Sequence, residues 1–278
     1  MSSSDRACPQ PPYAAEVIGA TAPFIPGGAL ASAWFTDDPA DAPAPPAADR
    51  ALAETVGAAR RPSLLAGRRA LRAAIQGALP GAGPAPVAAE QTPAAAWATL
   101  AIPATLRGAP ALPAGVTGSI SHKRLAPDAN DPNGAPRGRA IAIAAFGAQQ
   151  TVGVDLEVRP TAAELGRPDI GPRILTAREL AALPTGDALQ RRETTLLAFA
   201  LKEAVYKAID PVVQRYVGFT EVEIDPDSPA DFYQGADEGL VTVRMLFADP
   251  AAHTLQLRAM WQRDAHWIIA LARATPRR

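Results

Sequence analysis

The sequence predicts an α+β protein made of two similar halves, because a helical segment is followed by β-strand candidates twice along the chain. The first half has helical periodicity over residues 51–79 and a strand candidate at 139–146. The second half has helical periodicity over 193–209, and its strand candidates are 219–224, 240–247, 253–263 and 266–273. We therefore place an N-terminal half at 1–150 and a C-terminal half at 151–278, although no sequence repeat proves the similarity.

The first half begins with a segment that predicts little regular structure. Residues 37–49 are rich in Pro, Ala and Asp, which favours a stiff, solvated connector. Leucine and isoleucine then recur at helical spacing over 51–79, and Pro62 interrupts this pattern. The proline-rich stretch 80–113 predicts a loop with one short element at 94–100.

The basic residues of the first helical segment share one side. Arg61, Arg68 and Arg72 are seven and four positions apart, which places them on one face at 3.6 residues per turn. A solvated helix face is the simplest interpretation of this pattern alone.

The strand candidates 139–146 and 151–158 are separated by four residues, a length typical of a hairpin. A helix is predicted at 176–183, and residues 263–265 predict a tight turn between the last two strands. The sheet of the C-terminal half is thus expected to be mainly antiparallel.

Composition limits the function classes. A net charge of -1 and a pI near 6.3 give no general attraction to nucleic acid or anionic lipid. The single Cys8 excludes an internal disulfide and a cysteine-based zinc site, and fits a reducing compartment. The first 13 residues do not form a signal peptide, and no apolar run approaches about 18 residues. We therefore expect a cytoplasmic protein without nucleic-acid partners or stable membrane insertion.

Lysine is scarce, and its positions attract attention. Of 27 lysine and arginine residues, only Lys123, Lys202 and Lys207 are lysines. Lysine carries a compact, mobile ammonium with a tunable pKa, whereas arginine is a rigid fork that stays charged. Lys202 and Lys207 flank Glu203, where a mobile ammonium has a use, whereas the sequence assigns no role to Lys123.

Carboxylates in two segments are suited to binding a cation. In a strand over 153–157, Asp155 and Glu157 project from one face, where water, an arginine partner or a bound cation can stabilise them. Hard oxygen ligands of this kind suit Mg²⁺. On the helix, Glu203 and Lys207 are four residues apart and favour a modest ion pair, while 197, 201, 204 and 208 mark the buried stripe.

Three segments, in this order and spacing, resemble the signature motifs of the 4'-phosphopantetheinyl transferases. They are Gly-Ser-Ile-Ser-His at 118–122, which ends the proline-rich loop, Gly-Val-Asp-Leu-Glu at 153–157, and Phe-Ala-Leu-Lys-Glu-Ala-Val-Tyr-Lys at 199–207. Leu-Ala-Gly-Arg at 65–68 and Trp-Gln-Arg-Asp at 261–264 are similar to the enterobactin-synthetase-associated branch of the Sfp-type group. Residues 1–50 match the family poorly.

The resemblance implies a monomer in which two similar α/β halves are related by a pseudo-two-fold axis, with the active site in the cleft between them. Coenzyme A would bind there with Mg²⁺, and its phosphopantetheine arm would pass to a serine of an apo acyl, aryl or peptidyl carrier protein. The pathway served, whether fatty acid, polyketide, nonribosomal peptide or siderophore, is not encoded in these motifs.

The resemblance also implies residue roles. Asp155, Glu157 and Glu203 would hold Mg²⁺, and Glu203 is a candidate base for the carrier serine. Lys207 would stabilise charge on the pyrophosphate, and Ser121 and His122 would contact coenzyme A. Basic positions near its 3'-phosphate match Arg60, Arg61, Arg68 and Arg107.

Two alternatives remain open at this stage. A Mg²⁺-dependent phosphohydrolase could use the same carboxylates without a carrier, and an inactive protein could still bind coenzyme A or a carrier. Two departures from the family pattern are Ala200, which replaces a hydroxyl residue, and an apparent insertion at 127–136, for which a solvated surface loop is the simplest interpretation.

Overall fold

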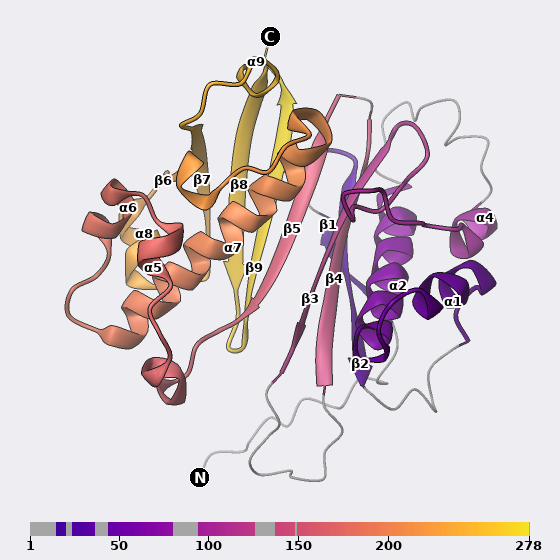
Figure 1. Ribbon diagram of the computed structural model, residues 1–278, viewed down its shortest axis with the longest axis horizontal. Coiled ribbons are helices and arrows are strands. Elements are labelled where there is room, and N and C mark those ends of the chain that lie inside the picture. Colours follow the sequence, from indigo (N-terminus) through magenta and orange to yellow (C-terminus); the bar gives the residue numbers. More distant parts are fainter. Residues whose placement is uncertain are drawn as a thin grey trace.

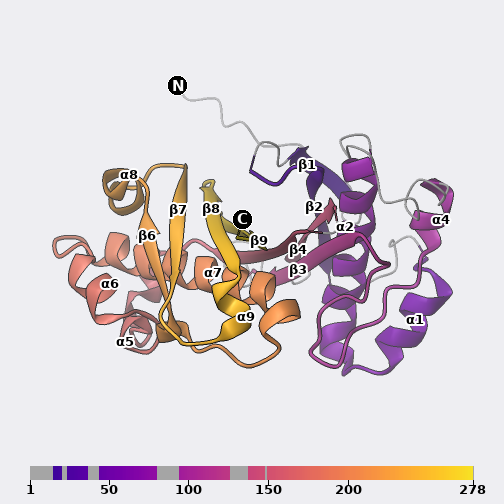
Figure 2. The same ribbon diagram turned by 90° about the horizontal axis from the view of Figure 1, so that it is seen from above.

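The fold is α+β, as predicted, and consists of two sheets that lie beside one another, each with one long helix packed on it (Figure 1 and Figure 2). A computed structural model describes residues 15–20, 24–36, 44–79, 94–125, 137–147 and 149–277. Within these ranges, no helix combines the length and apolar character needed to cross a membrane. Cys8 and the apparent insertion at 127–136 lie outside the described residues.

The first sheet is four-stranded and antiparallel, with the order β1-β2-β4-β3. Its strands are β1 (Ala15–Ala20), β2 (Gly28–Thr36), β3 (Val116–Arg124) and β4 (Arg137–Phe146). Its helices are α1 (Ala47–Glu54), the short 3-10 turn η1 (Ala58–Arg60), α2 (Arg61–Ala78) and α4 (Ala94–Thr99). Pro62 occupies the first turn of α2, where its missing N–H costs nothing, so the predicted interruption marks a helix start.

The second sheet is five-stranded and antiparallel, with the order β5-β9-β8-β7-β6. Its strands are β5 (Thr151–Val158), β6 (Val222–Pro226), β7 (Glu238–Met245), β8 (Leu255–Arg263) and β9 (Trp267–Pro276). Its helices are η3 (Ala162–Gly166), α5 (Gly171–Ile174), α6 (Ala177–Ala182), α7 (Ala188–Val213), η4 (Phe219–Glu221), α8 (Pro229–Gln234) and α9 (Pro250–His253).

The two halves share one connectivity. In the first, strand β2 is followed by α2 and then by the β3–β4 pair, and β4 lies between β2 and β3. In the second, β5 is followed by α7 and later by the β8–β9 pair, and β9 lies between β5 and β8. The similarity of the halves is therefore visible in strand order, although the sequence shows no clear repeat.

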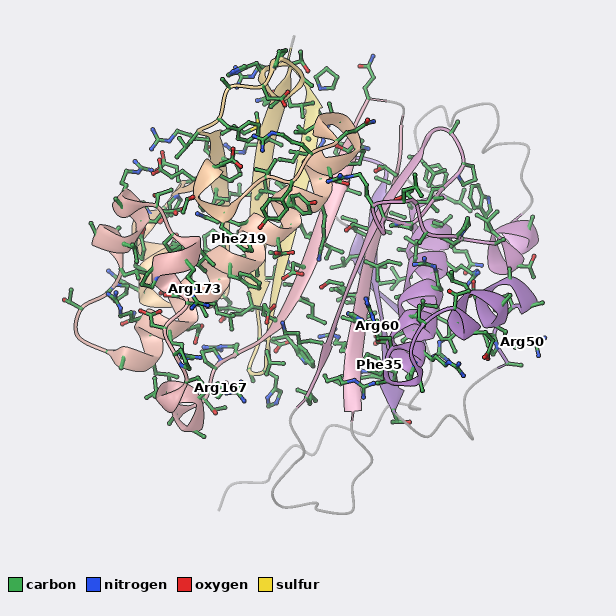
Figure 3. All side chains as sticks on the ribbon, in the orientation of Figure 1. Phe35, Arg50, Arg60, Arg167, Arg173 and Phe219 are labelled. Atoms are coloured by element: carbon green, nitrogen blue, oxygen red, sulfur yellow. The ribbon has the colours of Figure 1, made fainter. Side chains whose placement is uncertain are left out.

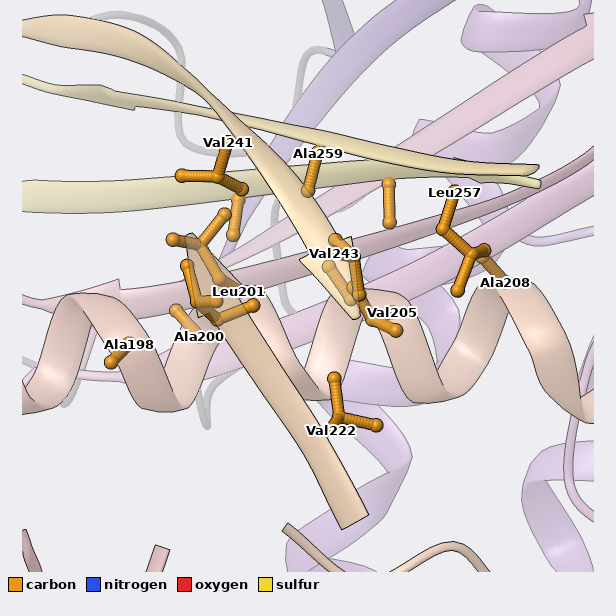
Figure 4. Close-up of a cluster of buried hydrophobic side chains, with 14 of the residues drawn as sticks. Ala198, Ala200, Leu201, Val205, Ala208, Val222, Val241, Val243, Leu257 and Ala259 are labelled. Atoms are coloured by element: carbon orange, nitrogen blue, oxygen red, sulfur yellow. The ribbon is translucent and has the colours of Figure 1, made fainter. Parts of the chain in front are cut away.

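Helix α7 packs on the second sheet through the apolar stripe that the sequence predicts. Leu197, Leu201, Ala204 and Ala208 are fully buried in one cluster. Side chains of the sheet, such as Val241 and Leu257, meet this stripe in Figure 4. Many contacts are made by alanine, which brings helix and sheet close together. Helix α2 packs on the first sheet in the same way, through Ala66, Ala70, Ala74 and neighbouring residues.

The halves meet along β3 and β5. Ser119 Oγ accepts a hydrogen bond from Val154 N (3.2 Å), and Ser121 Oγ donates to Asp155 Oδ1 (2.7 Å). Because the numbers rise together along both strands, β3 and β5 run in the same direction. Behind them, a third apolar cluster joins the two sheets, and it includes Ile141, Ile143, Val154 and Leu156.

A glycine allows α7 to reach β5. A Cβ atom at residue 153 would lie 1.9 Å from the carbonyl oxygen of Ala204, far inside any permitted contact. Helix and strand backbones therefore touch at this point, which only glycine permits. The glycine of the second motif thus fixes the height of α7 above the strand that carries Asp155.

Several expectations were wrong. Strands β4 and β5 do not form a hairpin: they belong to different sheets, because β4 pairs with β2 and β3 while β5 pairs with β9. The 118–122 motif lies in strand β3 and not at the end of a loop. Strands β1 and β2 were not predicted.

The prediction that the arginines of α2 form a solvated helix face was also wrong. Arg68 and Arg72 are each 6% exposed. Arg72 forms a two-pronged ion pair with Asp49, with distances of 2.5 and 2.9 Å. Asp49, expected in a solvated connector, is buried in α1 instead. Pairing is what makes burial of these charges possible.

We expect Gly153→Ala to lower the free energy of unfolding by about 2–3 kcal/mol or more, because the new methyl group must push α7 away from β5. Urea unfolding followed by circular dichroism measures this. Gly186→Ala is the matched control, since no atom lies within 4 Å of its added Cβ. Equal stability of the two variants would contradict the close approach.

Candidate active site

A cleft of about 1000 Å³ lies between the two halves. Its first wall comes from Arg68, the loop at 105–112 and the start of β3. The other wall is formed by the last three turns of α7 and the beginning of β5. Four of the predicted site residues line it, namely Arg68, Arg107, Glu203 and Lys207.

Asp155 connects the three elements beneath the cleft. It is 5% exposed, and its Oδ1 accepts hydrogen bonds from Ser121 Oγ of β3 and from Lys207 Nζ of α7, both at 2.7 Å. Its other oxygen, Oδ2, is buried and has no hydrogen-bond partner among the described atoms. A buried carboxylate oxygen without a partner is costly, and a bound cation would satisfy it.

Glu157 projects from the same face of β5 as Asp155, as the alternation predicts, while Val154 and Leu156 enter the core. It pairs with Lys123 of β3, whose Nζ lies 2.5 Å from Glu157 Oε1. Burial raises the pKa of Glu157 to about 7, against the opposing effect of Lys123. Lys123, which had no role in the sequence-based prediction, is therefore the partner that favours the charged form of this buried acid.

Lys207 does not pair with Glu203 as the helical spacing suggests. Its ammonium contacts Asp155 and donates to the carbonyl oxygen of Val154 at 3.0 Å. Glu203, half-buried in the cleft wall, forms no hydrogen bond or ion pair with any residue that the structure describes. Burial raises its pKa, and the nearby Asp155 adds to this rise while Lys207 opposes it.

Cations gather at the other end of β3. Arg60, at the start of α2 (Figure 3), lies near His122, and both are partly exposed to solvent. Partial burial of the imidazole lowers the pKa of His122, and Arg60, Lys207 and Lys123 lower it further. His122 is thus surrounded by positive charge that favours an anion. Arg61 pairs with Glu54 at 3.1 Å on the surface.

Arg68 and Arg107 face the cleft from the first half. Arg68 Nε donates to the carbonyl oxygen of Ile102 (2.8 Å), and burial lowers its pKa. Arg107 reaches across to α7, where it binds Asp210 and the hydroxyl of Tyr206. Asp210 was not among the predicted site residues. It lies seven residues after Glu203 and three after Lys207, and these spacings place all three side chains on one helix face.

Two of the three predicted metal ligands suit a cation in this arrangement. No group of three His, Cys, Asp or Glu side chains is placed to hold a metal within the described ranges. Asp155 offers its unpartnered Oδ2, and Glu203 is unpaired and close enough for Asp155 to raise its pKa. Mg²⁺ commonly takes one or two carboxylates and completes its shell with water and phosphate oxygens. The metal-binding roles of Asp155, Glu157 and Glu203 all stay predictions.

Lys202 lies on a different face of α7 and away from the cleft carboxylates. It is 2% exposed, and its Nζ pairs with Glu179 (2.6 Å) and donates to the carbonyl oxygens of Ile174 and Phe219. The expectation that Lys202 provides a mobile ammonium beside Glu203 was wrong. Its ammonium instead ties α5, α6 and η4 to α7.

The Trp-Gln-Arg-Asp segment at 261–264 is also structural. Trp261 is fully buried against Phe232, and Arg263 pairs with Glu193 at 2.8 Å. Asp264 Oδ1 accepts hydrogen bonds from the backbone N–H groups of His266 and Trp267, which closes the predicted tight turn.

Comparisons with known proteins point to one superfamily for part of the chain. A family model described as the 4'-phosphopantetheinyl transferase superfamily matches residues 151–257. This segment contains Asp155, Glu157, Glu203 and Lys207 but neither Arg68 nor Arg107. The search of curated proteins finds no match.

Similar solved structures include two from Chronobacterium ammoniagenes. One is an apo-ACPS structure, with 24% identity and a TM-score of 0.34. The other is an ACPS–CoA complex, with 23% identity and a TM-score of 0.34. Each alignment covers 46% of this chain and 98% of the other.

We expect Lys202→Met to lower the free energy of unfolding by about 3–5 kcal/mol, because it leaves Glu179 buried without its countercharge. Urea unfolding measures the loss. The control is Arg167→Met, which removes an exposed cation (Figure 3) and should cost less than about 1 kcal/mol. Wild-type stability of the Lys202 variant would contradict the structural role.

Proposed function

We propose that this protein is a 4'-phosphopantetheinyl transferase, a holo-[carrier-protein] synthase. The observation that carries the proposal is the cleft itself, where Glu203 and Lys207 from one half face Arg68 and Arg107 from the other. The reaction would transfer the phosphopantetheine arm of coenzyme A to a serine of an apo acyl, aryl or peptidyl carrier protein. The superfamily match over 151–257 supports this choice.

The first half would bind the nucleotide end of coenzyme A. Guanidinium groups match phosphate oxygens in shape and charge, and those of Arg68 and Arg107 line the cleft. Arg60 adds positive potential at the far end of β3, beside His122. The 3'-phosphate would lie among these groups, with Arg61 at the margin because it is paired with Glu54. Ser121 would act indirectly, through its hydrogen bond to Asp155.

Mg²⁺ would be held by Asp155 and Glu203, which fit it through the unpartnered Oδ2 and the unpaired carboxylate. When bound, the ion would neutralise charge on the pyrophosphate. Glu157 lies two residues along the same strand face and would contribute if Lys123 released it. Lys207, held beside Asp155, would place a second positive charge next to the same phosphates.

The protein's own groups would then carry out the transfer. Glu203 would accept the proton of the carrier serine hydroxyl, a role favoured by burial that raises its pKa above that of an ordinary carboxyl group. The serine oxygen forms a bond to the phosphorus that carries the pantetheine arm. The pyrophosphate bond at that phosphorus breaks, and adenosine 3',5'-bisphosphate leaves with its charge stabilised by the cleft cations.

The two-half architecture supports the Sfp-type group and its enterobactin-synthetase-associated branch. The family match falls in the second half, and the first half repeats the same strand order. On this proposal one chain forms a complete cleft and works as a cytoplasmic monomer. The division between halves would lie near residue 150, between the end of β4 and the start of β5.

The direct test is incubation of the protein with coenzyme A, Mg²⁺ and a panel of apo acyl and peptidyl carriers. We expect one carrier serine to gain the mass of phosphopantetheine. If coenzyme A is hydrolysed without a carrier, the phosphohydrolase alternative is favoured. No carrier modified across the panel would reject the transferase.

Glu203→Gln should lower the transfer rate about 10²- to 10⁴-fold, because the amide can neither accept the proton nor balance a cation. Glu238→Gln removes an exposed carboxyl group on β7 and should transfer at the wild-type rate. Both should unfold at the wild-type urea concentration. A normal rate for Glu203→Gln would remove this residue from the mechanism.

Chelation of divalent ions with EDTA should abolish transfer, and added Mg²⁺ should restore it, because the unpartnered oxygen of Asp155 and the carboxylate of Glu203 need a countercharge beside the phosphates. The rate of carrier modification measures this dependence. Persistence of the full rate in EDTA would exclude a metal role for these residues.

A further inference from the structure

Arg107 sits on a short, internally braced loop. Backbone hydrogen bonds join Thr105 N to Ala109 O (2.8 Å), Gly108 N to Thr105 O (2.9 Å) and Ala111 N to Pro103 O (2.9 Å). Gly108 closes the tip with φ = +85°, a conformation that favours glycine. Leu106, beside Arg107, is fully exposed, so the loop tip makes little apolar contact. The loop is rigid within itself, and its arginine anchors it to α7.

The contacts of Arg107 use one edge of its guanidinium. Nε donates to Asp210 Oδ1 at 2.7 Å, Nη2 lies 2.6 Å from the same oxygen in the ion pair, and Nη2 donates to Tyr206 Oη at 3.1 Å. Of the five N–H groups, those on Nε and Nη2 face these two partners. The two on Nη1 have no partner among the residues that the structure describes, and the side chain is 37% exposed and lines the cleft.

The carboxylate of Asp210 does not stabilise helix α7. It is 8% exposed and lies in the last turn of α7, where the helix dipole disfavours negative charge. A buried carboxylate there requires a cation, and Arg107 of the opposite half supplies it. The hydrogen bond to Asp210 raises the pKa of Arg107, so the guanidinium stays charged.

We propose that Asp210 is a positioning residue for substrate binding, which fixes one edge of the Arg107 guanidinium so that Nη1 is presented to a phosphate of the nucleotide substrate. Tyr206 assists by accepting a hydrogen bond from Nη2. Without Asp210, the arginine on its exposed loop must be ordered each time a ligand binds. The fixed orientation therefore lowers the entropic cost of each encounter. This inference rests on the proposed function, since it takes coenzyme A as the ligand.

The test is equilibrium binding of coenzyme A by calorimetry, with no carrier present, followed by steady-state transfer. We expect Asp210→Asn to raise the Kd and the KM for coenzyme A about tenfold, the size of a lost charge-assisted hydrogen bond. The value of kcat should change less than about threefold, because Asp210 does not touch the reacting atoms. Asp227→Asn, which breaks a surface pair with Arg258, is the matched control and should bind as the wild type does.

A double-mutant cycle separates positioning from general structural damage. In an Arg107→Ala background, Asp210→Asn should cause little further loss, whereas independent effects would add. Arg107→Lys provides a variant that keeps the ion pair with Asp210 but has no second pair of N–H groups, and it should bind coenzyme A as poorly as Arg107→Ala. Normal coenzyme A binding by Arg107→Lys would mean that the ion pair between residue 107 and Asp210 only holds the two halves together.

The outcomes distinguish failure of the proposed function from failure of the positioning role of Asp210. If the wild-type protein binds no coenzyme A, the proposed function fails. If it binds and Asp210→Asn binds equally well, the positioning role alone fails. Tighter binding by Asp210→Asn would show that Asp210 competes with the phosphate, and it would overturn the proposal as well.

Discussion

Helix α7 touches strand β5 at a distance that only glycine at position 153 permits, and the geometry of the cleft follows from this contact. Because the backbones meet there, Lys207 can reach both the side chain of Asp155 and the carbonyl oxygen of Val154. A larger residue would raise the helix and separate the ammonium from the carboxylate. Backbone packing therefore sets the electrostatics of the site.

Helix α7 sends its side chains to three environments. Its apolar stripe faces the second sheet, Lys202 faces α5 and α6, and Glu203, Lys207 and Asp210 face the cleft. Lys202 and Lys207 therefore have different roles, although they lie only five residues apart on the same helix. Lys202 is buried among oxygen acceptors from α5, α6 and η4 and holds these elements against α7. Lys207 remains partly exposed and lines the cleft. Burial and partners, not residue type, separate structure from chemistry here.

The sequence was most informative where local rules decide the outcome. Helical periodicity predicted α7 and its stripe, and strand alternation predicted that Asp155 and Glu157 share a face. It failed where partners are distant in the chain: the pairing of Lys123 with Glu157, the burial of Arg72 by Asp49, and the reach of Arg107 to Asp210 each join different elements. A four-residue link could not reveal that β4 and β5 enter different sheets. Sheet pairing depends on the whole fold.

Charge is distributed unequally between two halves that share a topology. The second half contributes Asp155, Glu157, Glu203 and Asp210, and three of these acids are buried. Lysine and arginine neutralise them in part: Lys123 and Arg107 from the first half, and Lys207 from α7. Within the part of the chain that the structure describes, one oxygen of Asp155 and the carboxylate of Glu203 are unpaired on one side of the cleft, and Nη1 of Arg107 is unpaired on the other. A ligand that satisfies both sides at once must carry a cation toward the acids and anionic oxygens toward the guanidinium. In the proposed reaction a magnesium-bound pyrophosphate has this charge pattern, and the groups that match it come from both halves.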